Sequence, residues 1–154
     1  MADADDLLSL DNQVCFALYA ANRAVNARYR PLLAELELTY PQYLVMLVLW
    51  EQARAGRKTR VSDLGRRLRL DSGTLTPLLK RLAERGLLLR QRSAEDERVV
   101  TLTLTAEGEA LKARAQSVPE RLLCGVGVAP ERLQALRQEL RAMLSALEGE
   151  APSG

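Results

Sequence analysis

The chain has 154 residues, of which 47% are hydrophobic and 27% charged, and its formal net charge is +2. This length predicts one domain with a core of its own, and no apolar run approaches the roughly 18 residues that a membrane span requires. The sequence contains no histidine, which excludes Ser-His and Cys-His catalysis, histidine-ligated zinc and histidine-based pH sensing.

The two cysteines, Cys15 and Cys124, are too far apart in the sequence to form a CxxC metal site or a disulfide framework. The first residues, MADADDLLSLD, are acidic and lack the basic start and apolar core of a signal peptide. We therefore expect a cytoplasmic protein whose cysteines are thiols, with no metal site, cofactor or membrane association.

An amphipathic helix is predicted from about Leu7 to Leu33, because apolar residues recur there at helical spacing. Cys15 lies inside this helix, and Tyr19 lies one turn further on the same face. A second helix should begin at Thr39, which has capping-box spacing to Gln42. Its sequence YLVMLVLWEQ is apolar nearly all round, which predicts a central buried position.

The segment Val61–Leu104 predicts a winged helix-turn-helix. The sequence VSDLGRRL should form a short helix, and Asp71 and Ser72 can cap a second one that ends at Gly86. The second helix has a leucine stripe for the core and an exposed side formed by Ser72, Thr74, Thr76, Lys80 and Arg81. Two strands, 87–92 and 98–104, follow and are joined by the charged turn SAEDE.

Basic residues are concentrated in this part of the chain. The segment from Arg54 to Arg92 contains twelve Lys and Arg but only three Asp and Glu, whereas the whole chain is only +2. This asymmetry favours phosphate binding over the alternative, a small packed α+β subdomain with a solvated charged face.

After the wing, Thr105 should cap a helix that runs to about Leu123 and is broken or bent near Pro119. A small-residue stretch, CGVGVAP, precedes a last helix that starts at Pro130. The apolar stripes of the first and last helices favour an interleaved homodimer, since two DNA half-sites need paired recognition helices roughly 34 Å apart. The alternative is that both helices pack only on their own subunit.

All six aromatic residues lie between positions 16 and 50, in the two helices that begin the chain. An isolated cysteine such as Cys15 is most often a small buried hydrophobic residue. A sensing thiol needs a populated thiolate, which tyrosine hydroxyls can stabilise as hydrogen-bond donors. Tyr19 is one turn away, but Tyr29 and Tyr40 are too distant along the helices to be neighbours of Cys15 in one subunit.

The sequence DSGTLTPLLKRLAERGLLLRQRSAEDERVVTLTLTAEG resembles the DNA-binding core of the MarR family of bacterial transcription regulators. Within it, LDSGTLTPLLKRL is similar to the recognition helix of the organic-hydroperoxide-sensing branch, the OhrR-type repressors. The resemblance covers nearly the whole chain and implies a mainly α fold with a small β wing. It also implies a single MarR-type domain over 1–154, a winged helix-turn-helix over 54–104 and dimerisation helices over 7–38 and 105–149.

The same resemblance implies roles for individual residues. Cys15 matches the peroxide-reactive cysteine of those repressors, and Tyr29 and Tyr40 match tyrosines that hold it partly from the other subunit. The resemblance also implies that Tyr19 is a further thiolate-stabilising residue. Cys124 matches the resolving cysteine of the two-cysteine kind, in which organic hydroperoxide oxidises Cys15 and a disulfide to Cys124 of the partner subunit releases DNA. The alternative for Cys124 is a buried spectator thiol.

The reduced homodimer should bind a pseudo-palindromic double-stranded operator and repress. The exposed residues of the second helix are expected in the major groove, where Ser and Thr can contact base edges or phosphates and the cations mainly phosphates. The resemblance implies that Arg98 enters the minor groove and that Asp96 orients it. Their spacing of two places both side chains on one face of the hairpin.

Two other functions remain open. One is a MarR-type repressor controlled by a non-covalent phenolic ligand, in which Cys15 is incidental. The other is a thiol peroxidase that uses Cys15 and Cys124. The helix-turn-helix occupies the middle of the chain, and no histidine or arginine is evidently placed to activate Cys15, so we expect a regulator and not an enzyme.

Overall fold

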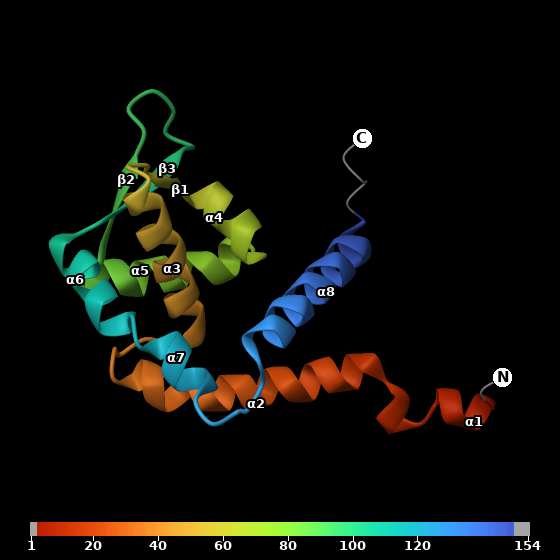
Figure 1. Ribbon diagram of the computed structural model, residues 1–154. Coiled ribbons are helices and arrows are strands. Elements are labelled where there is room, and N and C mark those ends of the chain that lie inside the picture. Colours follow the sequence, from red (N-terminus) through yellow and green to blue (C-terminus); the bar gives the residue numbers. More distant parts are fainter. Residues whose placement is uncertain (1–2, 150–154) are drawn as a thin grey trace. The chain divides into compact units, whose positions relative to one another are not determined.

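The computed structural model describes residues 3–149 (Figure 1). The chain forms two compact units, one that extends to Leu122 and one that starts at Leu123. No helix within the described residues is long and apolar enough to cross a membrane.

The N-terminal part is divided into three helical pieces, α1 (Ala4–Leu7), the 3-10 helix η1 (Leu10–Asn12) and α2 (Val14–Ala34). The prediction of one continuous helix from Leu7 is therefore wrong at its start. Side-chain amides explain the break, because Gln13 donates to the carbonyl of Leu7 at 2.7 Å and Asn12 to that of Asp6 at 2.7 Å. These bonds compete with the regular helical hydrogen bonds of the backbone.

The central element is α3 (Tyr40–Arg54), which contacts α2, α4, α5, α6 and β3. The predicted capping box is confirmed: the Gln42 N–H donates to the Thr39 hydroxyl, and the Thr39 N–H donates to the Gln42 side chain at 2.9 Å. The helix is buried on most sides, as predicted. Its buried residues are Gln42, Tyr43, Val45, Met46, Val48, Leu49 and Trp50.

The helix-turn-helix consists of α4 (Val61–Leu68) and α5 (Ser72–Glu84). Asp71 is the N-cap of α5, where its carboxylate accepts the Thr74 N–H at 2.8 Å. Leucines of both helices pack into one core with α3. Those that are almost fully buried are Leu64, Leu75, Leu79 and Leu82.

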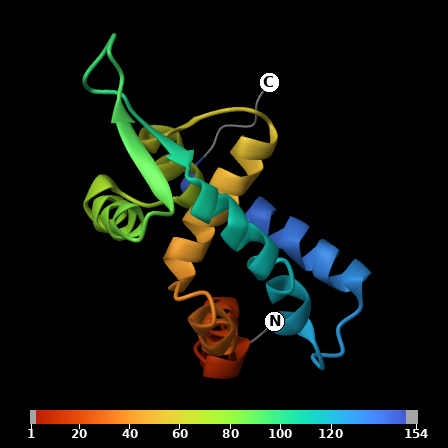
Figure 2. The same ribbon diagram turned by 90° about the vertical axis from the view of Figure 1, so that its left-hand side faces the viewer.

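The wing belongs to a three-stranded antiparallel sheet of order β1-β3-β2. Its strands are β1 (Thr59–Arg60), β2 (Leu88–Arg92) and β3 (Val100–Leu104). The hairpin of β2 and β3 projects from one end of the first unit in both views (Figures 1 and 2). The sequence did not predict β1, because two residues within a polar linker carry no alternating pattern.

The helix expected after the wing is broken near Pro119, as one of the two predicted alternatives, into α6 (Ala106–Ala115) and α7 (Val118–Leu123). The break falls just before Pro119, whose ring nitrogen cannot donate to a carbonyl one turn back. Thr105 caps α6 as predicted, since its hydroxyl accepts the Gly108 N–H at 3.0 Å. The second unit contains α8 (Pro130–Glu148), which starts at the predicted proline.

Candidate nucleic-acid interface and thiol site

The predicted DNA-contacting residues share one exposed side of α5. Ser72, Thr74, Thr76, Lys80 and Arg81 are all exposed, while the opposite side of the helix is in the core. The N-terminus of α5 is fixed by Asp71, and the backbone N–H and hydroxyl of Thr74 hold the pKa of this carboxyl below its usual range. The helix therefore presents hydroxyls near its capped start and two cations further along.

The wing tip presents Arg98 next to Asp96. The Asp96 carboxylate accepts the backbone N–H of Arg98 at 3.0 Å and its side-chain Nε–H at 3.2 Å. The backbone N–H, followed by the guanidinium, lowers the pKa of Asp96. The Arg98 side chain is 91% exposed, so the pair orients a cation that projects into solvent.

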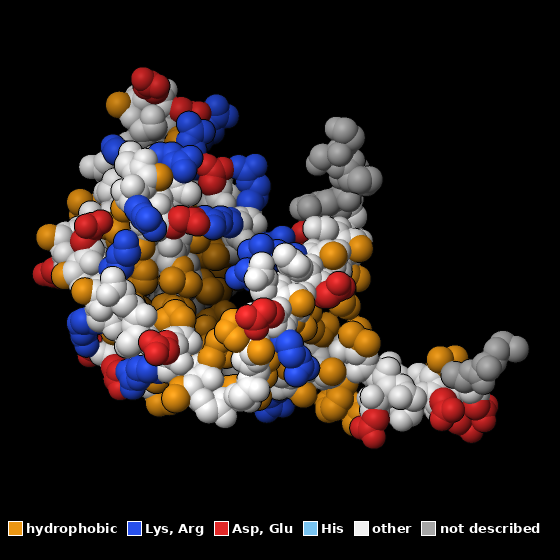
Figure 3. Space-filling model, viewed as in Figure 1, with side chains coloured by type: hydrophobic (Ala, Val, Ile, Leu, Met, Phe, Trp, Pro, Cys, Tyr) orange, Lys and Arg blue, Asp and Glu red, His pale blue; other side chains and the backbone are white. Residues whose placement is uncertain are grey.

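Figure 3 shows Lys and Arg side chains over the winged helix-turn-helix. Some of the cations counted in the sequence are engaged within the protein. Arg66 pairs with Asp63, and Arg67 joins α4 to α3 through Glu51 and lowers the pKa of that carboxyl. The charge excess of the segment therefore overstates the number of cations that are available to phosphates.

Replacing Arg98 by Ala should weaken DNA binding about equally on different sequences. A cation that neutralises one phosphate releases condensed counterions, so its removal should reduce the slope of log K against log salt by about one. The measurement is fluorescence anisotropy with a labelled duplex at several salt concentrations.

Asp96→Ala is the matched control, because it keeps the cation and removes only the group that orients it. We expect this variant to lose affinity without a change of salt slope. An Arg98→Ala protein with the wild-type slope would show that the wing contacts neither phosphates nor a groove.

Cys15 is the second residue of α2 and is exposed within the chain. Tyr19, one turn further on, is 58% exposed and accepts a hydrogen bond from Arg23 at 3.3 Å, and the guanidinium lies 5.6 Å from the centre of its ring. Arg23 was not predicted from the sequence, although its spacing of four from Tyr19 places both side chains on one face of the helix.

Tyr29 and Tyr40 come together at the other end of α2. Their ring centroids are 4.7 Å apart, and both rings line a pocket of about 570 Å³ at the junction of α2 and α3. Burial, reinforced by the neighbouring tyrosines, raises the pKa of Tyr29 to about 12. Burial also raises the pKa of Tyr40. Both hydroxyls therefore stay protonated at neutral pH and can act as donors.

One subunit cannot bring Cys15 to this tyrosine pocket. Fourteen residues of continuous helix separate Cys15 from Tyr29, which corresponds to about 21 Å at the helical rise. The structure thus brings Tyr29 and Tyr40 together, while Cys15 and Tyr19 lie one turn apart near the start of α2.

Cys124 lies in the segment between α7 and α8 and is exposed, so it is not buried within the chain. Gly125 and Gly127 in this segment have φ of 79° and 72°, the left-handed conformation that glycine adopts without strain. The small-residue stretch therefore forms an irregular connection next to the thiol.

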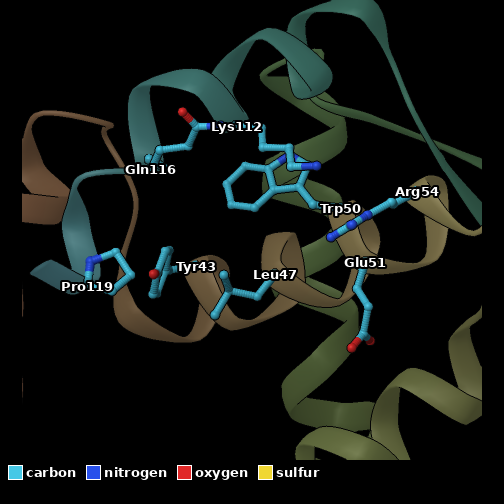
Figure 4. Close-up of a pocket in the computed structure, with 9 residues that line it drawn as sticks. Tyr43, Leu47, Trp50, Glu51, Arg54, Lys112, Gln116 and Pro119 are labelled. Atoms are coloured by element: carbon cyan, nitrogen blue, oxygen red, sulfur yellow. The ribbon is translucent and has the colours of Figure 1, made fainter. Parts of the chain in front are cut away.

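A further pocket of about 300 Å³ lies between α3 and the helices α6 and α7 (Figure 4). Its wall includes Tyr43 and Trp50, and Arg54 and Lys112 also line it. The Trp50 indole N–H is satisfied by the carbonyl of Gly108 at 2.9 Å. This pocket could not be predicted from the sequence, because its residues come from helices that are far apart in the chain.

Known proteins share this architecture. The family model for transcriptional regulator SarA/Rot matches residues 27–115. The organic hydroperoxide resistance transcriptional regulator of Bacillus subtilis is 44% identical over 96% of this chain and 97% of its own length. The HTH-type transcriptional regulator TtmR of Methylorubrum extorquens is 47% identical over 97% of this chain and 74% of its own.

The crystal structure of AbfR from Staphylococcus epidermidis superposes with a TM-score of 0.76, at 32% identity, over 97% of this chain and 100% of AbfR. AbfR has also been solved in a reduced, DNA-bound form and in a disulfide form. The resemblance to MarR-type regulators is thereby confirmed over nearly the full length. The chain belongs to the SarA/Rot family of transcriptional regulators, with a winged helix of the MarR type.

Proposed function

We propose that the protein is a redox-sensing repressor that binds operator DNA as a reduced homodimer and releases it when organic hydroperoxide oxidises Cys15. The observation that carries the proposal is the separation of a reactive-cysteine position from its tyrosine pocket along one rigid helix. Cys15 and the pocket of Tyr29 and Tyr40 are complementary halves of one site, and a second copy of the chain would complete it. The name of the Bacillus subtilis relative supports organic hydroperoxide as the oxidant.

Dimerisation would use the exposed apolar residues of the N-terminal and C-terminal helices, within 7–38 and 105–149. Exposed examples are Leu10, Val14, Phe16, Leu136 and Leu140. Leu136 and Leu140 line an apolar groove along α8, and a contiguous exposed apolar patch is typical of an interaction surface. The winged helix-turn-helix of residues 54–104 would then occur twice in each dimer. We expect such a DNA-binding regulator to be in the cytoplasm.

The thiol chemistry has two steps. The Cys15 thiolate attacks the distal oxygen of the hydroperoxide, the O–O bond breaks, and the products after protonation are an alcohol and the sulfenic acid of Cys15. The thiol of Cys124 of the partner subunit then attacks the sulfenic sulfur, which forms a disulfide and releases water. Tyr29 and Tyr40 of one subunit would donate hydrogen bonds to the thiolate of the other and raise its population.

The DNA-binding side would place α5 in the major groove with the residues described above, and Arg98, oriented by Asp96, in the minor groove. A disulfide between subunits would move the two α5 helices out of register with their half-sites. To lower occupancy about a hundredfold, the oxidised state has to disfavour DNA by only about 2.7 kcal/mol. Thiol exchange would reduce the disulfide and restore binding.

The test combines non-reducing gel electrophoresis with DNA binding for wild type, Cys15→Ser and Cys124→Ser. The DNA probe is a duplex selected by the reduced wild-type protein from a random library, and the oxidant is one equivalent of cumene hydroperoxide per chain. We expect wild type to become a covalent dimer and to lose DNA, Cys15→Ser to do neither, and Cys124→Ser to form no covalent dimer.

Three other results would contradict the proposal in different ways. DNA retention by oxidised wild type would remove the thiol switch and favour a phenolic ligand as the inducer. A covalent dimer formed by Cys124→Ser would exclude the pairing of Cys15 with Cys124. Consumption of many peroxide molecules per thiol would indicate a peroxidase.

A further inference from the structure

The turn between α2 and α3, residues 35–39, is bound by the end of the recognition helix. Arg85, the C-cap of α5, donates through its guanidinium to the backbone carbonyls of Leu36, at 3.1 Å, and of Glu37. The Glu37 carboxylate lies 3.7 Å from the same group. One guanidinium thus contacts two consecutive carbonyls nearly fifty residues earlier in the chain, with the fork geometry that makes Arg suited to paired acceptors.

Two more arginines hold the same turn from other helices. Arg114 of α6 donates to the carbonyl of Glu35 at 2.6 Å. Arg121 of α7 makes a two-point ion pair with the Glu35 carboxylate at 2.6 and 3.0 Å, and this pairing lowers the pKa of Glu35. Of the three arginines that bind the turn, Arg85 is the one that belongs to the end of α5.

The turn has one defined conformation. Glu37 has φ of 55°, which is uncommon for a residue other than glycine and persists only where surrounding contacts enforce it. Leu36 and Leu38 on either side are 3% and 6% exposed and fix the turn to the core. A change in backbone angles at Glu37 would reorient the carbonyls that Arg85 binds, and both hydrogen bonds would be lost together.

The turn is also part of the tyrosine pocket. Leu38 and Thr39 line the pocket together with Tyr29 and Tyr40, and Tyr40 follows the turn directly. Because only a few covalent bonds separate Tyr40 from the turn, a displacement of Tyr40 would change the backbone conformation of the turn. The turn lies between the candidate sensor on one side and the end of α5 on the other.

We propose that Arg85 is a positioning residue that transmits the state of the tyrosine pocket to the recognition helix. Its clamp on the carbonyls of Leu36 and Glu37 holds α5 in the orientation that binds DNA while Cys15 is reduced. Oxidation displaces the tyrosines, the turn changes conformation, and the clamp opens. This inference rests on the proposed function and adds the route by which the pocket controls α5.

The clamp predicts an asymmetric effect of its removal. In Arg85→Gln, reduced protein should bind DNA about tenfold more weakly, because α5 is no longer held. Oxidised protein should bind as oxidised wild type does, because its clamp is already open. A merely structural role, or a phosphate contact of Arg85, would weaken both states by the same factor.

The experiment measures anisotropy of the selected duplex with reduced protein and with protein treated with cumene hydroperoxide. The variants are Arg85→Gln, Arg85→Lys and, as the matched control, Arg114→Gln, which loses a bond to the same turn from a helix other than α5. The rate of Cys15 oxidation is followed by mass spectrometry, and folding is checked by circular dichroism.

We expect the ratio of oxidised to reduced dissociation constants to fall from about 100 in wild type to about 10 in Arg85→Gln. Arg85→Lys, which keeps the charge but lacks the fork, should give an intermediate ratio, and Arg114→Gln should keep the wild-type ratio. All variants should oxidise at the wild-type rate. If folded Arg85→Gln and Arg85→Lys both kept the wild-type ratio, the proposed role of Arg85 would be wrong and the redox switch would stand. If the DNA affinity of wild type did not respond to oxidation, the proposed function would be wrong, and the role of Arg85 with it.

Discussion

Gly108→Ala should lower the free energy of unfolding by about 3 kcal/mol, the upper end of the range for overpacking a core. A Cβ at position 108 would lie 2.1 Å from the carbonyl oxygen of Leu87 and 3.0 Å from the side chain of Leu104. The Leu87 carbonyl cannot yield easily, because it accepts the Thr105 N–H at 3.2 Å. Either α6 or the start of the wing must therefore move.

The measurement is urea unfolding at a fixed protein concentration, followed by the fluorescence of Trp50, the only tryptophan of the chain. Trp50 reports on this contact directly, because its indole N–H donates to the carbonyl of Gly108. The shift of the midpoint at constant slope gives the change in stability.

Gly73→Ala is the matched control, since it introduces the same methyl group near the start of α5. The nearest atom to a Cβ there is the Asp71 carboxylate oxygen, at 3.4 Å. Ala is the better helix former, so stability should stay the same or rise by up to about 1 kcal/mol. Equal stabilities of the two variants would contradict the close approach of α6 to Leu87.

The fold could largely be predicted because its determinants are local. The caps at Thr39, Asp71 and Thr105 stand at the starts of helices, and their hydrogen bonds involve residues only three positions away. Two elements were predicted wrongly or not at all. The helix start before α2 is broken by hydrogen bonds from the side chains of Asn12 and Gln13 to backbone carbonyls. β1 exists because Thr59 and Arg60 pair with β3, about forty residues later, and nothing in the linker itself encodes that pairing.

The candidate site was predicted only in part, for the same reason. Exposed residues of α5 follow from helical periodicity, and Asp96 and Arg98 are neighbours in the sequence. The roles of Tyr29 and Tyr40 were inferred from the resemblance to OhrR-type repressors. Their spacing in the sequence indicates only that neither tyrosine can reach Cys15 within one subunit. The contact of Arg85 with the turn joins positions far apart in the chain, and an arginine at the end of a basic helix gives no sign of it.

Tyr29→Phe should slow the oxidation of Cys15 by cumene hydroperoxide about tenfold near neutral pH. In the proposed dimer the Tyr29 hydroxyl donates to the Cys15 thiolate across the subunits. A hydrogen bond to a charged group contributes about 1.5–3 kcal/mol, so its loss would lower the thiolate population. The remaining thiolate is somewhat more nucleophilic, which reduces the loss of rate. The pH at which the rate reaches half of its maximum should rise by at least about one unit, since 1.36 kcal/mol corresponds to one unit.

The rate is measured by mass spectrometry of quenched samples from pH 5 to pH 9, a range in which the Tyr29 hydroxyl stays protonated because its pKa is raised to about 12. Tyr43→Phe is the matched control: its ring lies 5.8 Å from that of Tyr29, but it lines the pocket of α3 and α6 and not the tyrosine pocket. It should leave the pH profile unchanged.

If Tyr29→Phe also left the pH profile unchanged, the Tyr29 hydroxyl would have no contact with the Cys15 thiolate, and the two halves of the site would not meet in the dimer. A loss of rate without a shift in pH would instead assign Tyr29 to binding the hydroperoxide, because only thiolate stabilisation moves the profile.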